Sequence, residues 1–120
     1  MRHKVTGLVV LGAALMVTAP AIAAADHTAA KTTTITVKMT EFKFALSKAS
    51  APKGTVIFKV TNKGSVAHDF KINGKKTSLV NPGKSATLTV KFQKTGKFPY
   101  LCTVPGHAAS GMKGTFTIKA

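Results

Sequence analysis

Only one cysteine and no tryptophan occur in the 120 residues. Because a lone cysteine, Cys102, cannot form a disulfide within the chain, a scaffold held together by disulfides is excluded. Acidic residues are also scarce: three of them stand against 18 lysines and arginines, which gives a formal net charge of +15. The longest apolar run, Val5 to Val17, is shorter than the roughly 18 residues that a membrane-spanning helix needs. The sequence therefore predicts one small, basic, soluble domain.

The chain begins with a segment, residues 1–25, that is typical of a secretory signal peptide. A basic cluster, Arg2 to Lys4, precedes the apolar run, and small residues follow it up to the first acid, Asp26. Signal peptides are cut after small residues, which predicts cleavage near Ala23 to Ala25 and a periplasmic or secreted product. An uncleaved membrane anchor is the alternative interpretation.

From Thr32 onward the hydrophobic pattern has a period of two, as in half-buried strands, rather than 3.6. We therefore expect residues 26–31 to form a short flexible lead-in and residues 32–120 to form one all-β domain. Turn signals separate the strands, among them Asn73-Gly74, which favours a two-residue hairpin. Short antiparallel strands at near-regular spacing indicate a sandwich or a small barrel. The eight expected strands are Thr33 to Thr40, Phe42 to Leu46, Thr55 to Thr61, His68 to Ile72, Thr77 to Val80, Ala86 to Phe92, Phe98 to Cys102 and Gly114 to Lys119.

Lysines alternate with apolar residues in these strands. Lys38, Lys59, Lys71 and Lys91 each stand between two apolar residues. We expect them on the solvent side of the strands, where charge also prevents edge-to-edge association. Lysines spread over many strands, with no arginine after the signal peptide, do not form the basic footprint of a nucleic-acid-binding protein. Their charge favours anionic partners of another kind.

The segment FPYLCTVPGHAASGMKG, residues 98–114, contains the only cysteine. In an extended strand Phe98, Tyr100 and Cys102 share one face, so the thiol is expected to point inward at the end of the strand. An exposed free thiol is a liability in an oxidising compartment. Cys102 is therefore expected to be either a small buried apolar residue or a ligand held by a bound partner.

Two turns after Cys102 can bring further donor atoms back to its sulfur. Pro105 and Gly106 predict a tight bend that returns His107, and the small residues that follow predict a second turn that returns Met112. Two histidines and a cysteine with a distant methionine form the blue-copper arrangement. The loop thus predicts a copper site that lacks one histidine.

The missing histidine has to come from another part of the chain. Outside the signal peptide the sequence offers only His27, in the expected lead-in, and His68, at the start of an expected strand. We favour His68, because its separation of 34 residues from Cys102 suits a ligand on a neighbouring strand. Ligands on a strand and one loop would form a preformed cage that moves little between Cu(II) and Cu(I). Taken singly, His68 also fits an ordinary strand residue, and Met112, like Met39, fits core packing.

These stretches resemble the cupredoxins, the small blue copper proteins of the plastocyanin, azurin, auracyanin and rusticyanin kind. The resemblance is closest in Val66-Ala67-His68-Asp69-Phe70, in Gly96 to His107, and in Gly111-Met112-Lys113-Gly114. The C-x4-H-x4-M spacing is more similar to that of rusticyanin and auracyanin than to the shorter loop of plastocyanin.

The resemblance implies a Greek-key β-sandwich of about eight strands that holds one mononuclear type 1 copper. His68, Cys102 and His107 would be its equatorial ligands and Met112 its weak axial ligand. The resemblance also implies that His107 presents its ring edge at the surface as the route for electrons.

Asp69 departs from the cupredoxin pattern, in which many relatives have asparagine directly after the first histidine. We expect the Asp69 carboxylate to accept a hydrogen bond from the Thr103 hydroxyl or from a loop N–H instead. An ionised group at this position would favour Cu(II) and lower the reduction potential.

We expect an electron shuttle between larger redox partners rather than an enzyme. The chain has no second cysteine for a dinuclear copper centre and no His-x-His pair for additional copper sites. Four protein ligands would also leave no open position for a substrate. The basic charge predicts redox partners with acidic docking faces, such as a cytochrome or an oxidase, or an anionic membrane surface. A shuttle of this size needs no oligomer, so we expect a monomer.

Two other functions remain alternatives. A periplasmic copper carrier or chaperone that delivers copper to an oxidase would use exposed methionine and histidine clusters, whereas Met39 and His27 are not clustered in the sequence. A basic sandwich that binds partners without metal would need Cys102 to be purely structural. Addition of Cu(II) to the apoprotein discriminates among the three functions.

Overall fold

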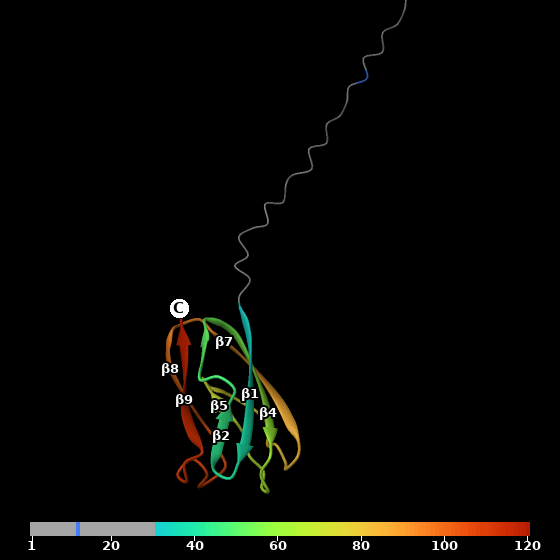
Figure 1. The fold of residues 1–120 in the computed structure, drawn as a ribbon, viewed down its shortest axis with the longest axis vertical. Coiled ribbons are helices and arrows are strands. Elements are labelled where there is room, and N and C mark those ends of the chain that lie inside the picture. The colour runs from blue at the N-terminus through green and yellow to red at the C-terminus, as the bar shows by residue number, and fades with distance from the viewer. Residues whose placement is uncertain (1–11, 13–30) are drawn as a thin grey trace, which may run out of the picture.

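The computed structural model describes Gly12 and residues 31–120. The expected signal peptide, apart from Gly12, and residues 26–30 of the expected lead-in lie outside the described residues. Two β-sheets form a sandwich (Figure 1), which confirms the predicted all-β fold. In the described part of the chain, no helix has the length and apolarity that crossing a membrane would require. The strands are β1 (Thr32–Thr40), β2 (Lys43–Leu46), β3 (Ser50–Pro52), β4 (Gly54–Asn62), β5 (Lys71–Ile72), β6 (Lys75–Lys76), β7 (Ser85–Phe92), β8 (Gly96–Leu101) and β9 (Lys113–Lys119).

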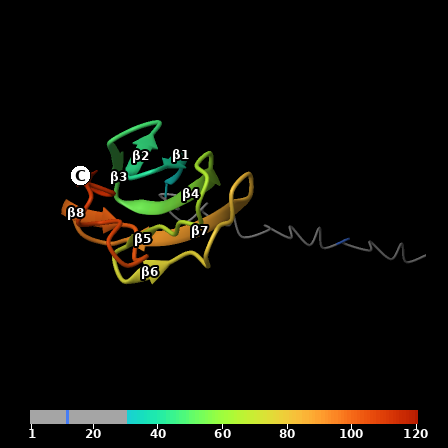
Figure 2. The ribbon, with the colours of Figure 1, turned by 90° about the horizontal axis from the view of Figure 1, so that it is seen from below.

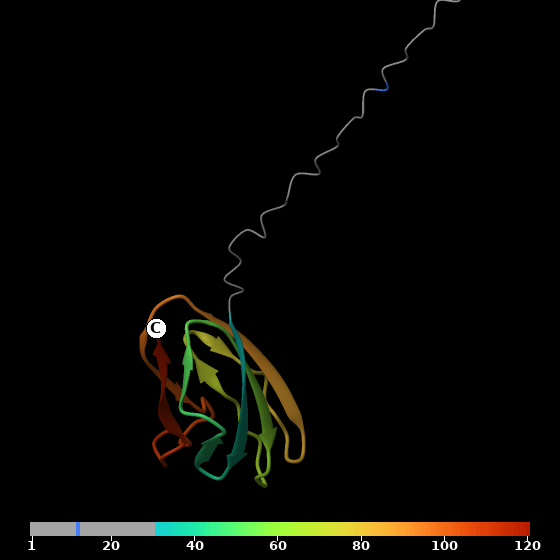
Figure 3. The same ribbon diagram turned by 45° about the horizontal axis from the view of Figure 1, so that its top comes forward.

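The first sheet consists mainly of long strands in the order β2-β1-β4-β7. β1 pairs with β4 in parallel, and β4 pairs with β7 antiparallel along almost its whole length (Figure 3). Ile35, Val37 and Met39 of β1 are fully buried, whereas Thr36 and Lys38 between them are exposed. The alternation of the sequence therefore gives this sheet one core face and one solvent face.

The second sheet has the order β3-β9-β8-β5-β6 and contains shorter strands. β5 and β6 have two residues each, joined by Asn73-Gly74 with φ of 50° and 73°. These positive φ values confirm the predicted two-residue hairpin. The sheets also approach each other at two places, where β2 contacts β9 and where the edge strand β6 contacts the edge strand β7. Figure 2 shows the two layers from the end at which the long loops gather.

Aromatic rings fill the space between the sheets. The ring of Phe58 in β4 has its centroid 5.1 Å from that of Phe70, 5.4 Å from that of Phe116 and 6.5 Å from that of Phe92. All four side chains are at most 2% exposed. Burying a phenylalanine contributes about 1.5–3 kcal/mol, so this cluster supplies stability that small exported domains often obtain from disulfides. Met39 is fully buried, which confirms its predicted core position.

The predicted solvent side of the strands is also confirmed. Lys38, Lys59, Lys71 and Lys91 are all exposed. The expected antiparallel pairing is wrong in two places, because β1 pairs with β4 in parallel and β3 pairs with β9 in parallel. β3 itself lies between the strands expected at Phe42 to Leu46 and at Thr55 to Thr61, where no strand is predicted. Its position at the edge of the sheet accommodates Pro52, since an edge strand does not need every N–H.

The strands expected at His68 to Ile72 and at Thr77 to Val80 are largely absent from the described fold. Only Lys71–Ile72 forms a strand in the first segment, and His68 and Val80 form a single bridge. Side chains interrupt the ladder, because the Phe70 N–H donates to the Thr77 hydroxyl at 3.1 Å. The segment that carries His68 is therefore held by the two backbone hydrogen bonds of this bridge and by side-chain contacts, not by a continuous ladder.

Two strand ends also differ from the prediction. Phe42 lies in the turn before β2 with φ of 67°, and β2 begins at Lys43. Cys102 lies one residue beyond the end of β8. Both differences leave side chains free of the strand pattern at the same end of the sandwich. β1 and β4 end there, and β2 and β9 begin there, at the lower end in Figure 1.

Candidate metal centre

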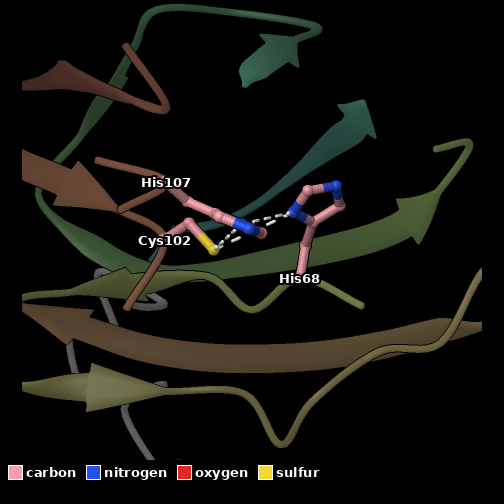
Figure 4. A group of neighbouring side chains, drawn as sticks. All are labelled: His68, Cys102 and His107. Carbon is pink, nitrogen blue, oxygen red and sulfur yellow. Dashed lines mark hydrogen bonds between the residues drawn. The ribbon is translucent and has the colours of Figure 1, made fainter. Parts of the chain in front are cut away.

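Three of the predicted ligands meet at this end of the sandwich (Figure 4). Cys102 Sγ lies 3.5 Å from His107 Nδ1 and 4.0 Å from His68 Nδ1, and the two Nδ1 atoms are 3.1 Å apart. The sulfur and the two ring nitrogens face one another. His68 is thus brought to the loop although it lies 34 residues before Cys102 in the sequence.

The spacing of these three atoms fits one metal ion. A point equidistant from them lies about 2.1 Å from each, close to the metal–nitrogen and metal–sulfur distances of about 2.0–2.3 Å known for such ligands. Two imidazoles and one thiolate are a donor set that suits copper, and zinc is the other common ion that it can hold. The cluster of His68, Cys102 and His107 therefore fits a type 1 copper site.

His68 is positioned by its backbone. Its N–H donates to the Val80 carbonyl at 3.1 Å, and its carbonyl accepts from the Val80 N–H at 2.7 Å. The side chain of Asn62, at the end of β4, donates to the same Val80 carbonyl at 2.7 Å and to the Val66 carbonyl at 2.8 Å. These contacts hold the segment before His68 against the first sheet, and the imidazole is fully buried.

The loop between β8 and β9 is closed by its own backbone. The Cys102 N–H donates to the Met112 carbonyl at 3.1 Å, and the Met112 N–H donates to the His107 carbonyl at 3.0 Å. The predicted first bend is present, with His107 N–H donating to the Val104 carbonyl at 3.1 Å and Gly106 at φ 83°. The sequence folds this way because Gly106 adopts positive φ without strain.

Met112 is fully buried at the end of this loop. Its backbone contacts with Cys102 and His107 hold it beside two of the candidate ligands. Its role as a weak axial ligand stays a prediction. His27, the other histidine considered, lies outside the described residues.

Exposure differs among the three clustered side chains. His68 is 0% and Cys102 1% exposed, whereas His107 is partly exposed. The ring of Phe42 packs edge-on against the His107 ring, with the centroids 5.1 Å apart. Of these three residues, His107 is therefore the one whose side chain is nearest to solvent.

Asp69 joins the two segments that carry the ligands. Its Oδ1 accepts from the Thr103 N–H at 2.6 Å, and its Oδ2 accepts from the Thr103 hydroxyl. The structure thus confirms the hydrogen bonds expected for the Asp69 carboxylate. Because Asp69 follows His68 and Thr103 follows Cys102, these bonds fix one candidate ligand relative to the other.

Two residues of the site were missed by the sequence analysis. Neither Asn62 nor Glu41 was predicted to contribute to it. Glu41 Oε1 lies 3.2 Å from His68 Nε2 and also accepts from the N–H groups of Ser65 at 2.7 Å and Val66 at 3.0 Å. These hydrogen bonds lower the pKa of Glu41 to about 2. Its rarity, as one of three acids in a lysine-rich chain, was the available signal.

The thiol has the opposite electrostatic environment. Burial raises the pKa of Cys102, although hydrogen bonds from the backbone of Asp69 and Val104 oppose the rise. A buried thiol resists ionisation unless a cation is close, and a coordinating thiol is deprotonated by its metal. Burial therefore favours the protonated thiol, and a bound metal ion would favour the thiolate.

Comparison with known proteins agrees with the geometry. The model of the cupredoxin-like domain family matches residues 7–118. Auracyanin-B from Chloroflexus aurantiacus is 43% identical over 42 residues, which are 35% of this chain and 18% of that protein. The copper-resistant cuproprotein CopI from Pseudomonas aeruginosa is 46% identical over 41 residues, 34% of this chain and 23% of that protein.

Similarity to solved structures extends over the whole sandwich. A dithionite-reduced auracyanin from Roseiflexus castenholzii superposes with a TM-score of 0.64 at 24% identity, over 73% of this chain and 98% of the other. At this identity the likeness concerns the fold. The matched part of the chain spans less than a quarter of the length of the two curated relatives.

Proposed function

The chain belongs to the cupredoxin-like domain family, and we propose that it is a type 1 copper protein that carries one electron between larger redox partners. The observation that carries this proposal is the meeting of Cys102 Sγ with the Nδ1 atoms of His68 and His107 in a buried cluster. Met112 is proposed as the weak axial ligand. Bound copper would supply a one-electron couple between Cu(II) and Cu(I).

The surrounding protein supports electron transfer by limiting movement of the ligands. His68 is tied to Val80 by two backbone hydrogen bonds, and Asp69 is tied to Thr103 by two more. A cage held in this way gives the two oxidation states nearly the same geometry, so little reorganisation opposes transfer. The partly exposed His107 ring is the proposed route for electrons.

Addition of Cu(II) to the purified metal-free protein tests the proposal. We expect one equivalent to bind with an intense blue colour that dithionite bleaches and reoxidation restores. Zinc added first should block the colour, because it fits the same cage. A pale complex, or no uptake by protein shown to be metal-free, would contradict the proposal.

The similarity to the copper-resistant cuproprotein CopI favours a second candidate. In this function the protein would act as a periplasmic copper carrier that delivers copper to an oxidase. A carrier has to release its ion, so the rate of copper loss to a chelator distinguishes the two functions. Loss within minutes would favour the carrier, and retention through many redox cycles the electron shuttle.

The partners proposed for the shuttle are redox proteins with acidic docking faces, such as a cytochrome or an oxidase. In the described residues Glu41 and Asp69 are the only acids, and both are engaged in hydrogen bonds at the site. The rest of this surface is basic, which accelerates encounter with an anionic partner at low salt. Electron-transfer rates that do not fall with rising ionic strength would contradict this choice of partner.

We also propose where the protein is located and in which oligomeric state it acts. The predicted signal peptide supports a periplasmic or secreted protein, and a single sandwich with one buried metal site supports a monomer that is not itself an enzyme. Size-exclusion chromatography of the copper form, with sequencing of its first residues, tests the monomeric state and the cleavage near Ala23 to Ala25.

A further inference from the structure

One side chain of the turn between β1 and β2 contacts the candidate metal centre. Glu41, in this turn, directs its carboxylate to the imidazole of His68, where Oε1 lies 3.2 Å from Nε2. This is the nitrogen opposite the one that faces Cys102, since His68 Nδ1 lies 4.0 Å from the sulfur. Both nitrogens of the buried ring are thus engaged, one inside the cluster and one behind it.

The carboxylate is itself held in place. The N–H groups of Ser65 and Val66 donate to its Oε1 at 2.7 and 3.0 Å. The backbone of Gly64 lies so close that a Cβ there would overlap the carboxylate. Asn62 Oδ1 accepts from the Gly64 N–H at 2.8 Å, which fixes this backbone in turn. The segment after β4 therefore forms a small cradle for one acidic side chain.

This contact decides where the proton of the neutral His68 ring lies. An ionised carboxylate accepts hydrogen bonds and has none to donate, so Nε2 must carry the hydrogen. A neutral imidazole has one N–H, so Nδ1 then carries no hydrogen and directs its lone pair at the cluster. The turn thus supplies the ligand with the correct tautomer before any metal binds.

We propose that Glu41 is a positioning residue that fixes the tautomer and orientation of His68 for metal binding. The proposal rests on the proposed role of His68 as a ligand. Outer carboxylates of this kind change metal affinity by 10–100-fold when they are removed. The charge also favours the more positive metal ion, so its loss should weaken binding of Cu(II) more than binding of Cu(I). A tenfold difference between the two losses corresponds to a 59 mV rise in the reduction potential.

The first test needs no copper. Long-range proton–nitrogen NMR spectra of the metal-free protein, recorded at about pH 8, above the usual histidine pKa of about 6.5, report which nitrogen of His68 is protonated. We expect Nε2–H alone in the unaltered protein and a mixture of tautomers in Glu41→Ala. Nδ1–H in the unaltered protein would overturn the proposal, whether or not the protein later binds copper.

The second test measures copper affinity by competition with a chelator, together with the reduction potential. We expect Glu41→Ala to bind Cu(II) at least tenfold more weakly, and Glu41→Gln to lose less because its amide oxygen can still accept. Gly64→Ala should reproduce the loss while the charge stays, because the new methyl displaces the carboxylate. Lys43→Gln, an exposed change at the first residue of β2 and two residues after Glu41, is the matched control and should leave the affinity within about twofold.

The outcomes separate this proposal from the proposed function. Unchanged tautomer and affinity in both Glu41→Gln and Gly64→Ala would overturn the role of Glu41. If the unaltered protein takes up no copper, the proposed function fails, while the NMR result still decides the tautomer. Should Glu41→Ala not fold, Glu41→Gln and Gly64→Ala carry the test.

Discussion

The two sheets of the sandwich differ in regularity. The sheet β2-β1-β4-β7 pairs β4 with its neighbours over eight consecutive residue pairs on each side. In the sheet β3-β9-β8-β5-β6, the β5 pairings contain only two residue pairs each. His68 lies just before β5 and Cys102 just after β8. The regular sheet thus supplies a platform, and the interrupted sheet frees the side chains that make the site.

Replacing Cys102, the proposed sulfur ligand, should have the largest functional effect of any change beside the interrupted sheet. We expect Cys102→Ser to abolish the intense blue absorption, because the thiolate that defines the copper site is lost. The metal-free fold should remain, since the loop is closed by backbone bonds that the change does not touch. Absorption and circular dichroism spectra of the copper-treated variant check both statements. A blue Cys102→Ser protein would show that the sulfur is not a ligand.

A core substitution in the regular sheet should lower the stability and leave the copper site intact. Phe58→Ala removes a fully buried ring in contact with three others and should lower the free energy of unfolding by about 3–5 kcal/mol. Its folded fraction should keep the blue colour. Urea denaturation of the metal-free protein measures the loss, and exposed Thr89→Ala in β7 is the control, with a change within about 0.5 kcal/mol. Loss of the blue absorption from the folded fraction, with little change in the free energy of unfolding, would contradict this difference between the sheets.

An Asp69→Asn variant tests how the segment that carries His68 affects the reduction potential of bound copper. Asp69→Asn removes a buried charge beside His68 while one oxygen can still accept from the Thr103 N–H. We expect the reduction potential to rise by about 60 mV, which corresponds to a tenfold change in the relative affinity for the two oxidation states. Voltammetry of the copper form provides the measurement. A fall, or no change, would show that the carboxylate does not act on the metal.

Replacing Tyr100 should have the smallest effect, a change in how the free energy of unfolding depends on pH at high pH. Burial raises its pKa above the usual 10.0, so the folded state keeps the phenol protonated longer than the unfolded state. The contribution is therefore complete below about pH 10 and is lost as the pH rises through the folded pKa. Unfolding free energies between about pH 9 and 11 should fall more steeply for the unaltered protein than for Tyr100→Phe. Equal slopes would contradict this.

The regular sheet was also the more predictable one. Alternation in β1, β4 and β7 follows from one core face, so strand identity and the exposed lysines could be read from periodicity. The parallel pairing of β1 with β4 could not be read from the sequence. β2 and β3 lie between these two strands in the chain, and no hairpin joins them. The convergence of His107 with Cys102 was predictable, since Pro105 and Gly106 favour a bend within one short loop.

The missed features are all side-chain contacts between distant segments. Thr77 interrupts an expected strand through its hydroxyl, and Asn62 holds a loop through its amide. Glu41 lies 27 residues before His68, and no local pattern links a turn residue to a ring nitrogen at that separation. The small number of acidic residues indicates that each one makes a specific contact, but only the three-dimensional structure identifies that contact.

The strands nearest the two ends of the domain both lie inside their sheets: β1 between β2 and β4, and β9 between β3 and β8. The second sheet cannot form until β9, which ends at Lys119, is available, so the chain exported in our proposal has to emerge almost completely from the translocation channel before this sheet folds. The cage formed by distant segments would then assemble only on the far side of the membrane. We expect the protein to acquire its ion there, from the pool of the outer compartment rather than from the cytosol.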